Sequence, residues 1–107
     1  MKLRSGAAVY IAGPMTGLPD FNRPAFHATA ALLAVFGGWR AINPARQPDG
    51  LTWEEYVRRG LADVRRADAV YLLPGWRDSR GATREVVQAF RLGLPVWDEE
   101  AGSWLTR

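Results

Sequence analysis

The chain has no cysteine and a single histidine, His27, among its 107 residues. The lack of cysteine excludes disulfides and a thiolate nucleophile, and one histidine excludes a metal site built from several histidines of one chain. No apolar run is long enough to cross a bilayer. The first such run follows basic residues but breaks at Gly13-Pro14 without a small-residue cleavage site, which argues against a secretion signal. We therefore expect a cytoplasmic protein without metal or other cofactor and without a membrane partner.

Excess charge of one sign is also small, with 14 lysines and arginines against 11 acidic residues and a net charge of +3. Most arginines fall on predicted helix faces, and no nucleic-acid-binding motif accompanies them, so a solvated surface is favoured over a nucleic-acid interface. Arg77, Arg80 and Arg84 are an exception because they surround one polar loop, where they could help to hold a phosphate.

What the chain does contain is a regular alternation of short apolar segments with helical patterns. Asn22 is a predicted N-cap with Pro24 in the first turn, and Thr52-Trp-Glu-Glu55 has the spacing of a capping box. The patterns predict strands over 8–12, 39–43, 69–73 and 94–97, with helices over 22–36, from 52 onward, and over 82–92.

This order predicts a parallel sheet covered by helices on both faces, in a small doubly wound, Rossmann-like α/β fold of four to five strands. We expect one domain over 1–107, with its core at about 8–97 and a tail or added edge element at 98–107. Ligands of such folds bind at the carboxyl ends of the strands, so the loops after the first and third strands should face one pocket.

The most informative segment is Asp78-Ser-Arg-Gly-Ala-Thr-Arg-Glu85, which joins the third strand to the last helix. A strand, a loop of small and polar residues and a helix N-terminus together form an anion site. Glu85 stands about one turn into that helix, where Arg80, Arg84 and the helix dipole should favour its ionised form. It is either a nucleophile or an acid that stabilises the helix dipole.

Three segments occur in a fixed order: Val9-Tyr-Ile-Ala-Gly-Pro14, Ala67-Asp68-Ala-Val, and Ser79-x-Gly81-x-x-x-Glu85. Together they resemble the nucleoside 2-deoxyribosyltransferase superfamily, over about residues 8–97. Gly13-Pro-Met-Thr-Gly-Leu-Pro and Leu72-Leu-Pro-Gly-Trp76 resemble its small bacterial and phage branch.

The resemblance implies a flavodoxin-like fold and cleavage or exchange at the N-glycosidic bond of 2'-deoxynucleosides or their 5'-monophosphates. It implies that Glu85 is the nucleophile, with Tyr10 beside it, and that Ser79 and Gly81 hold the 5' end of the sugar. It also implies a homo-oligomer with shared sites. The alternative interpretation is that Tyr10 has no functional role and is a half-buried aromatic residue of the core, on the first strand.

One position departs from the superfamily pattern: Gly60 stands where an aspartate usually lies, eight residues ahead of Asp68. Asp63 is either a substitute for that acid or a surface residue. Gly60 shares a helix stripe with Trp53 and Tyr56. It either admits a ligand or a neighbouring element at close range or, as we favour, allows close packing against the sheet.

The remaining candidates are binding residues. Gly13, Pro14 and Met15 belong to a loop that could close over a base or sugar, with Met15 and Phe21 as stacking partners. Trp76 either packs within the protein or stacks on a base. Arg80 is a candidate for binding phosphate.

Three functions therefore remain open. The first is an N-glycosidase or deoxyribosyltransferase acting on a small-molecule nucleoside or nucleotide. The second is a nucleotide-binding module that has lost catalysis, suggested by Gly60. The third and weakest is a basic nucleic-acid accessory protein.

Overall fold

The computed structural model of the chain describes residues 1–105. It has five strands: β1 (Ala8–Ala12), β2 (Arg40–Ile42), β3 (Ala69–Leu72), β4 (Val96–Asp98) and β5 (Ser103–Leu105). It has three α-helices: α1 (Arg23–Gly37), α2 (Trp53–Arg65) and α3 (Arg80–Arg91). Three short 3-10 turns precede these helices or follow a strand: η1 (Pro19–Asn22), η2 (Pro44–Arg46) and η3 (Trp76–Asp78).

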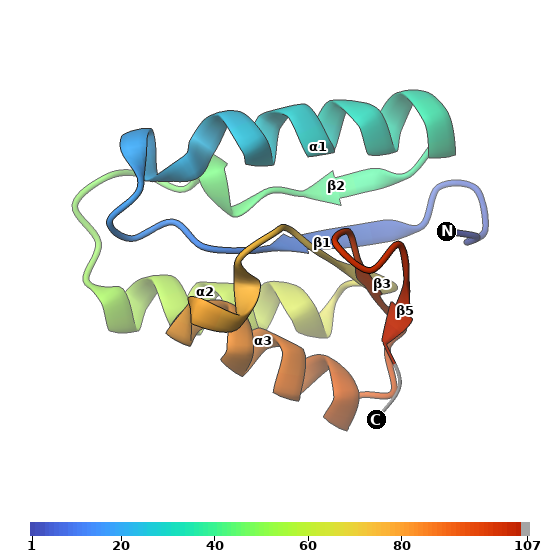
Figure 1. Cartoon of the computed structure of the whole chain (residues 1–107). Helices are drawn as coiled ribbons and strands as arrows, with labels where there is room; N and C mark the ends of the chain where they lie inside the picture. Colours follow the sequence, from blue (N-terminus) through green and yellow to red (C-terminus); the bar gives the residue numbers. More distant parts are fainter. Residues whose placement is uncertain (106–107) are drawn as a thin grey trace.

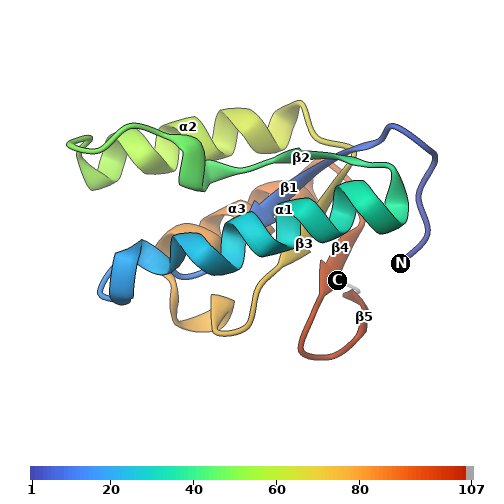
Figure 2. The ribbon, with the colours of Figure 1, turned by 90° about the horizontal axis from the view of Figure 1, so that it is seen from above.

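The strands form one sheet in the order β2-β1-β3-β4-β5. The first four run parallel and β5 pairs antiparallel with β4. Helix α1 covers one face of the sheet, and α2 and α3 lie side by side on the other (Figure 1). Figure 2 shows the same three layers from above. The fold is therefore a small flavodoxin-like α/β fold, as the alternating sequence pattern predicts.

The central strand β1 is buried along its whole length, which explains its uninterrupted apolar sequence. Its side chains alternate between two cores. Val9 and Ile11 pack with Phe26 of α1, while Tyr10 faces the side covered by α2 and α3. A tyrosine hydroxyl is thereby brought into the layer between the sheet and the helix pair.

The predicted strands are all present; the first has the predicted bounds, and the bounds of the others differ by at most two residues. Helix α3 begins at Arg80 and not at Ala82, because the Ser79 hydroxyl accepts a hydrogen bond from the Ala82 amide at 3.1 Å and caps the helix two residues earlier. The expected edge element is β5; Thr106 and Arg107 of the predicted tail lie outside the described residues.

The two predicted N-caps have different outcomes. The capping box of α2 is confirmed in both directions: Thr52 Oγ1 accepts from the Glu55 amide, and Glu55 accepts from the Thr52 amide, each at 3.1 Å. Asn22 does occupy the N-cap position of α1, but its side chain makes no capping bond. Its Nδ2 instead donates to the Pro14 carbonyl at 3.0 Å, which ties η1 to the loop after β1.

Within the part of the chain that the structure describes, no helix combines the length and the apolar character needed to cross a membrane.

Candidate active site

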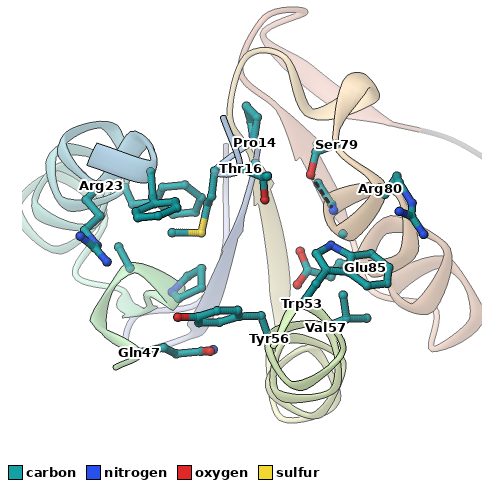
Figure 3. Close-up of a pocket in the computed structure, with 18 of the residues that line it drawn as sticks. Pro14, Thr16, Arg23, Gln47, Trp53, Tyr56, Val57, Ser79, Arg80 and Glu85 are labelled. Carbon is teal, nitrogen blue, oxygen red and sulfur yellow. Dashed lines mark hydrogen bonds between the residues drawn. The ribbon is translucent and has the colours of Figure 1, made fainter. Parts of the chain in front are cut away.

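A cavity of about 630 Å³ lies at the carboxyl edge of the parallel strands, as expected for this fold. Its walls come from the loops after β1 and β2, the first turns of α2 and the beginning of α3. In Figure 3, Arg23 stands on one side of the cavity and Ser79 and Arg80 on the other, with Glu85 between them.

The hydroxyl of Tyr10 donates a hydrogen bond to Oε2 of Glu85 at 2.5 Å, at the inner wall of this cavity. Tyr10 is 1 % exposed and Glu85 is 8 % exposed, so the pair is almost removed from solvent. The two residues come from β1 and α3, 75 positions apart in the sequence. The structure thus brings together the carboxyl and the phenol that the sequence singles out.

Burial raises the pKa of Glu85 to about 8; the Tyr10 hydrogen bond acts in the opposite direction, and the charge of Asp63 raises the pKa further. Burial also holds the pKa of Tyr10 well above its ordinary value, with the charge of Glu85 as the next cause. The prediction that Glu85 is ionised at neutral pH is therefore wrong. Because α3 begins at Arg80, Glu85 lies in its second turn, beyond the strongest influence of the helix N-terminus.

The arginines near Glu85 do not compensate for this burial. Arg80 and Arg84 place their guanidinium groups over the ring of Trp53, at 4.3 and 5.3 Å from its centroid. Arg77 lies over the ring of Trp76 at 4.5 Å. Of the three arginines, only Arg80 lines the cavity, so the predicted cluster contributes a single arginine to the site.

The predicted 5'-end cradle does lie in the cavity wall: Ser79, Arg80 and Gly81 all line it at the beginning of α3. Packing within the chain does not require glycine at position 81, since an added Cβ would meet nothing closer than 4.0 Å. A side chain there would instead occupy space next to the cavity. The helix start is therefore open to a ligand.

The loop after β1 forms the opposite side of the entrance, where Gly13, Pro14, Met15 and Phe21 line the cavity as predicted. Glycine is needed at position 13 because a Cβ would lie 2.7 Å from the Cβ of Leu73. Three consecutive non-glycine residues of η1, over 20–22, have φ between 50° and 60°. Such strained backbone is commonly found at binding sites.

Two predicted residues lie outside the cavity wall. Trp76 is buried in the core beneath α3, so its ring is not available to stack on a ligand. Asp63 forms an ion pair with Arg66 at 3.1 Å on the surface of α2. Its charge still influences the pKa values of Glu85 and Tyr10, but its position does not support the predicted role of substitute catalytic acid.

Several lining residues were not predicted, and most come from the segment after β2 and from the first turns of α2. Trp53 and Tyr56 form an aromatic wall, and Arg23 faces Asp49, to which it donates a hydrogen bond. Two signals in the sequence could have found them. The loop after the second strand ends at the same sheet edge as the other two, and the stripe of Trp53, Tyr56 and Gly60 runs toward that edge.

Gly60 itself lies against the pair of Glu85 and Tyr10. A Cβ at this position would be 2.1 Å from Oε2 of Glu85 and 2.9 Å from the hydroxyl of Tyr10. The favoured interpretation, plain packing against the sheet, is therefore wrong: position 60 admits a neighbouring element, because the side chain nearest to it is Glu85 of α3.

Among residues 1–105, the side chains of His, Asp and Glu nowhere gather in a group of three that could hold a metal ion.

The comparisons with known proteins concern the same region. A family model described as "Domain of unknown function (DUF4406)" matches residues 7–98, which include every strand except β5 and all the predicted site residues. The chain belongs to the DUF4406 family. No curated protein matches it. For this DUF4406 member, the function must therefore be argued from the site.

Proposed function

We propose that this DUF4406 domain is an enzyme that cleaves the N-glycosidic bond of 2'-deoxynucleosides or deoxynucleoside 5'-monophosphates, or exchanges the base. The proposal rests on the buried pair of Glu85 and Tyr10 at the inner wall of a cavity with aromatic sides. A cavity of about 630 Å³ is within the range of small-molecule sites. The sequence resemblance to deoxyribosyltransferases supports the same chemistry.

The arrangement of the walls favours the 5'-monophosphate as substrate. The beginning of α3 offers backbone amides and the Arg80 guanidinium to a phosphate, and Gly81 leaves room beside them. Glu85 lies between this end and the far wall, so a sugar can lie over the carboxyl while its base extends toward Tyr56 (Figure 3). Met15 also lines the cavity. Aromatic and thioether side chains suit the faces of a base.

The proposed reaction has two steps, each through the anomeric carbon. A carboxylate oxygen of ionised Glu85 attacks C1' of the sugar while the C1'–N bond breaks and its electron pair leaves with the base, which takes up a proton. Water, or a second base, then attacks C1' and releases the Glu85 carboxylate, with retention of configuration overall. The Tyr10 hydroxyl orients the carboxylate in both steps.

The decisive experiment is chromatography of free base after incubation with the four deoxynucleoside 5'-monophosphates and the four deoxynucleosides. Each substrate is tested with and without an added acceptor base, which distinguishes transfer from hydrolysis. Glu85→Gln keeps the shape of the side chain and should abolish release. Base release that persists in Glu85→Gln would remove Glu85 from the role of nucleophile.

A second candidate, a nucleotide-binding module without catalysis, is favoured by one observation: Gly60 stands where the resembled superfamily has an acid, and Asp63 lies outside the cavity wall. This candidate predicts nucleotide binding in calorimetry together with no base release from any of the eight substrates. Measurable release from one of them would exclude it.

We also propose that the protein is cytoplasmic and acts as a homo-oligomer. Apolar side chains exposed on α1 support the oligomer: Leu32, Val35 and Phe36 are 55, 75 and 83 % exposed.

A further inference from the structure

The carboxyl of Glu85 is enclosed by two different elements besides its own helix. Oε2 accepts the Tyr10 hydrogen bond from β1, and it lies where a Cβ of residue 60 on α2 would be, at 2.1 Å. No real Cβ approaches an oxygen so closely, so any other residue at position 60 must displace the carboxyl or move the helix. The Glu85 carboxyl can therefore occupy its observed position only because residue 60 has no side chain.

Helix propensity argues against glycine at this position. Glycine is among the worst residues for a helix interior, and Gly60 lies in the second turn of α2, which is otherwise well capped. The Cβ distances indicate what this glycine accommodates: the three nearest atoms belong to Glu85 and Tyr10 alone. Gly60 therefore accommodates the catalytic pair more closely than it does the apolar core.

We propose that Gly60 is a positioning residue that holds the Glu85 carboxyl in its buried place against Tyr10. A methyl group at position 60 would push the carboxyl into the cavity, away from Tyr10 and toward water. The catalytic part of this inference rests on the proposed function, but the positioning itself does not.

The first test is the titration of the Glu85 carboxyl by carbon-13 NMR in wild-type protein and in Gly60→Ala, with the signal assigned by Glu85→Gln. In Gly60→Ala, the pKa of Glu85 should fall from about 8 toward its ordinary value of 4.5, because burial is the largest cause of the shift. Loss of the Tyr10 hydrogen bond, which lowers the pKa, acts in the opposite direction but is a smaller effect than burial, and Asp63 of α2 stays in place. An unchanged pKa in Gly60→Ala would overturn the proposal.

Gly81→Ala is the matched control. Gly81 is also a glycine inside a helix, but a Cβ there meets nothing closer than 4.0 Å, so the pKa of Glu85 should not move. Base release as a function of pH should follow the titration, with its midpoint shifted to lower pH in Gly60→Ala. If wild-type protein releases no base, the proposed function fails, while the NMR titration still decides the role of Gly60.

A second measurement covers the case in which Gly60→Ala folds but is too unstable for the NMR titration. The urea midpoint of Gly60→Ala is compared with that of the double variant Gly60→Ala/Glu85→Ala, each relative to its own parent. Removing the Glu85 carboxyl eliminates the 2.1 Å contact, so the loss of midpoint should be smaller in the Glu85→Ala background. An equal loss in both backgrounds would show that Gly60 serves helix packing and not the carboxyl.

Discussion

Glu85 is the residue on which both the proposed chemistry and the pH dependence of stability depend, because burial raises the pKa of its carboxyl to about 8. At pH 7 such a carboxyl is ionised in about one molecule in ten. A nucleophile must be ionised, whereas a buried acid is most stable when neutral. The raised pKa therefore predicts opposite pH dependences: activity should rise with pH, whereas the free energy of unfolding should fall.

For activity, kcat/KM for base release should rise about tenfold per pH unit below pH 8 and level off above it. The reason is that only the ionised form of Glu85 in the free enzyme attacks C1'. The measurement is initial-rate chromatography between pH 5.5 and 9.5. Activity that instead falls above pH 8 would assign Glu85 the role of a general acid.

For stability, the free energy of unfolding should decrease as the pH rises from about 4.5 to about 8. The folded chain retains the Glu85 proton in this window while the unfolded chain has released it, and each pKa unit corresponds to about 1.4 kcal/mol. Glu85→Gln should reduce this decline and be more stable than wild type at pH 9. Urea unfolding at several pH values tests this; parallel curves for the two proteins would contradict it.

Tyr10 affects Glu85 through one hydrogen bond. Tyr10→Phe removes the donor, so the pKa of Glu85 should rise further and the activity midpoint should move to higher pH. The lost bond should also cost about 1–2 kcal/mol of stability. Tyr71→Phe is the control, because Tyr71 donates to Glu99 at 2.9 Å outside the cavity. A shift of the same size in both variants would exclude a specific role for Tyr10.

Among the elements, α2 and α3 have equivalent N-caps but different relations to the cavity. Thr52 and Ser79 each accept a hydrogen bond from a backbone amide three residues on, at 3.1 Å. Only Ser79 also lines the cavity. Comparing variants of Thr52 and Ser79 therefore distinguishes the stabilising effect of an N-cap from an effect on ligand binding.

Thr52→Ala and Ser79→Ala should each lower the free energy of unfolding by about 1 kcal/mol. Only Ser79→Ala should also weaken the binding of a deoxynucleoside 5'-monophosphate, because its hydroxyl lies at the proposed phosphate end. Urea unfolding and calorimetry measure the two effects. Equal affinities in both variants would remove Ser79 from the binding site.

At the scale of the whole molecule, the exposed apolar face of α1 lies across the sheet from the helix pair that carries Glu85 (Figure 1). A second copy of the chain would bury apolar side chains that a monomer leaves in water. This is the physical basis of the proposed homo-oligomer.

Light scattering should give a mass that is a multiple of the chain's 11.9 kDa, and Phe36→Glu should reduce it to the monomer. Val87→Glu, at an exposed apolar residue of α3, serves as the control. A monomeric wild-type protein would overturn the oligomer, and an unchanged mass in Phe36→Glu would place the interface away from α1.

The order of strands and helices, the sheet edge that carries the cavity, and the pairing of Glu85 with Tyr10 could be predicted from the sequence. Period-2 and period-3.6 patterns, capping residues and the rule for parallel sheets are local or topological, and they do not depend on exact side-chain positions. The capping box at Thr52 and the first strand are examples in which local chemistry agrees with the final fold.

Only the tertiary structure decided the protonation of Glu85, the place of Trp76 in the core and the reason for Gly60. The pKa of a carboxyl depends on how many atoms exclude water from it, and those atoms come from β1 and α2 as well as from its own helix. Trp76 lies in the core and Trp53 in the cavity wall, because which aromatic side chain reaches the cavity depends on how α2 and α3 pack together. A sequence shows which side chains share a helix face, but the distances between elements arise only when the layers are assembled.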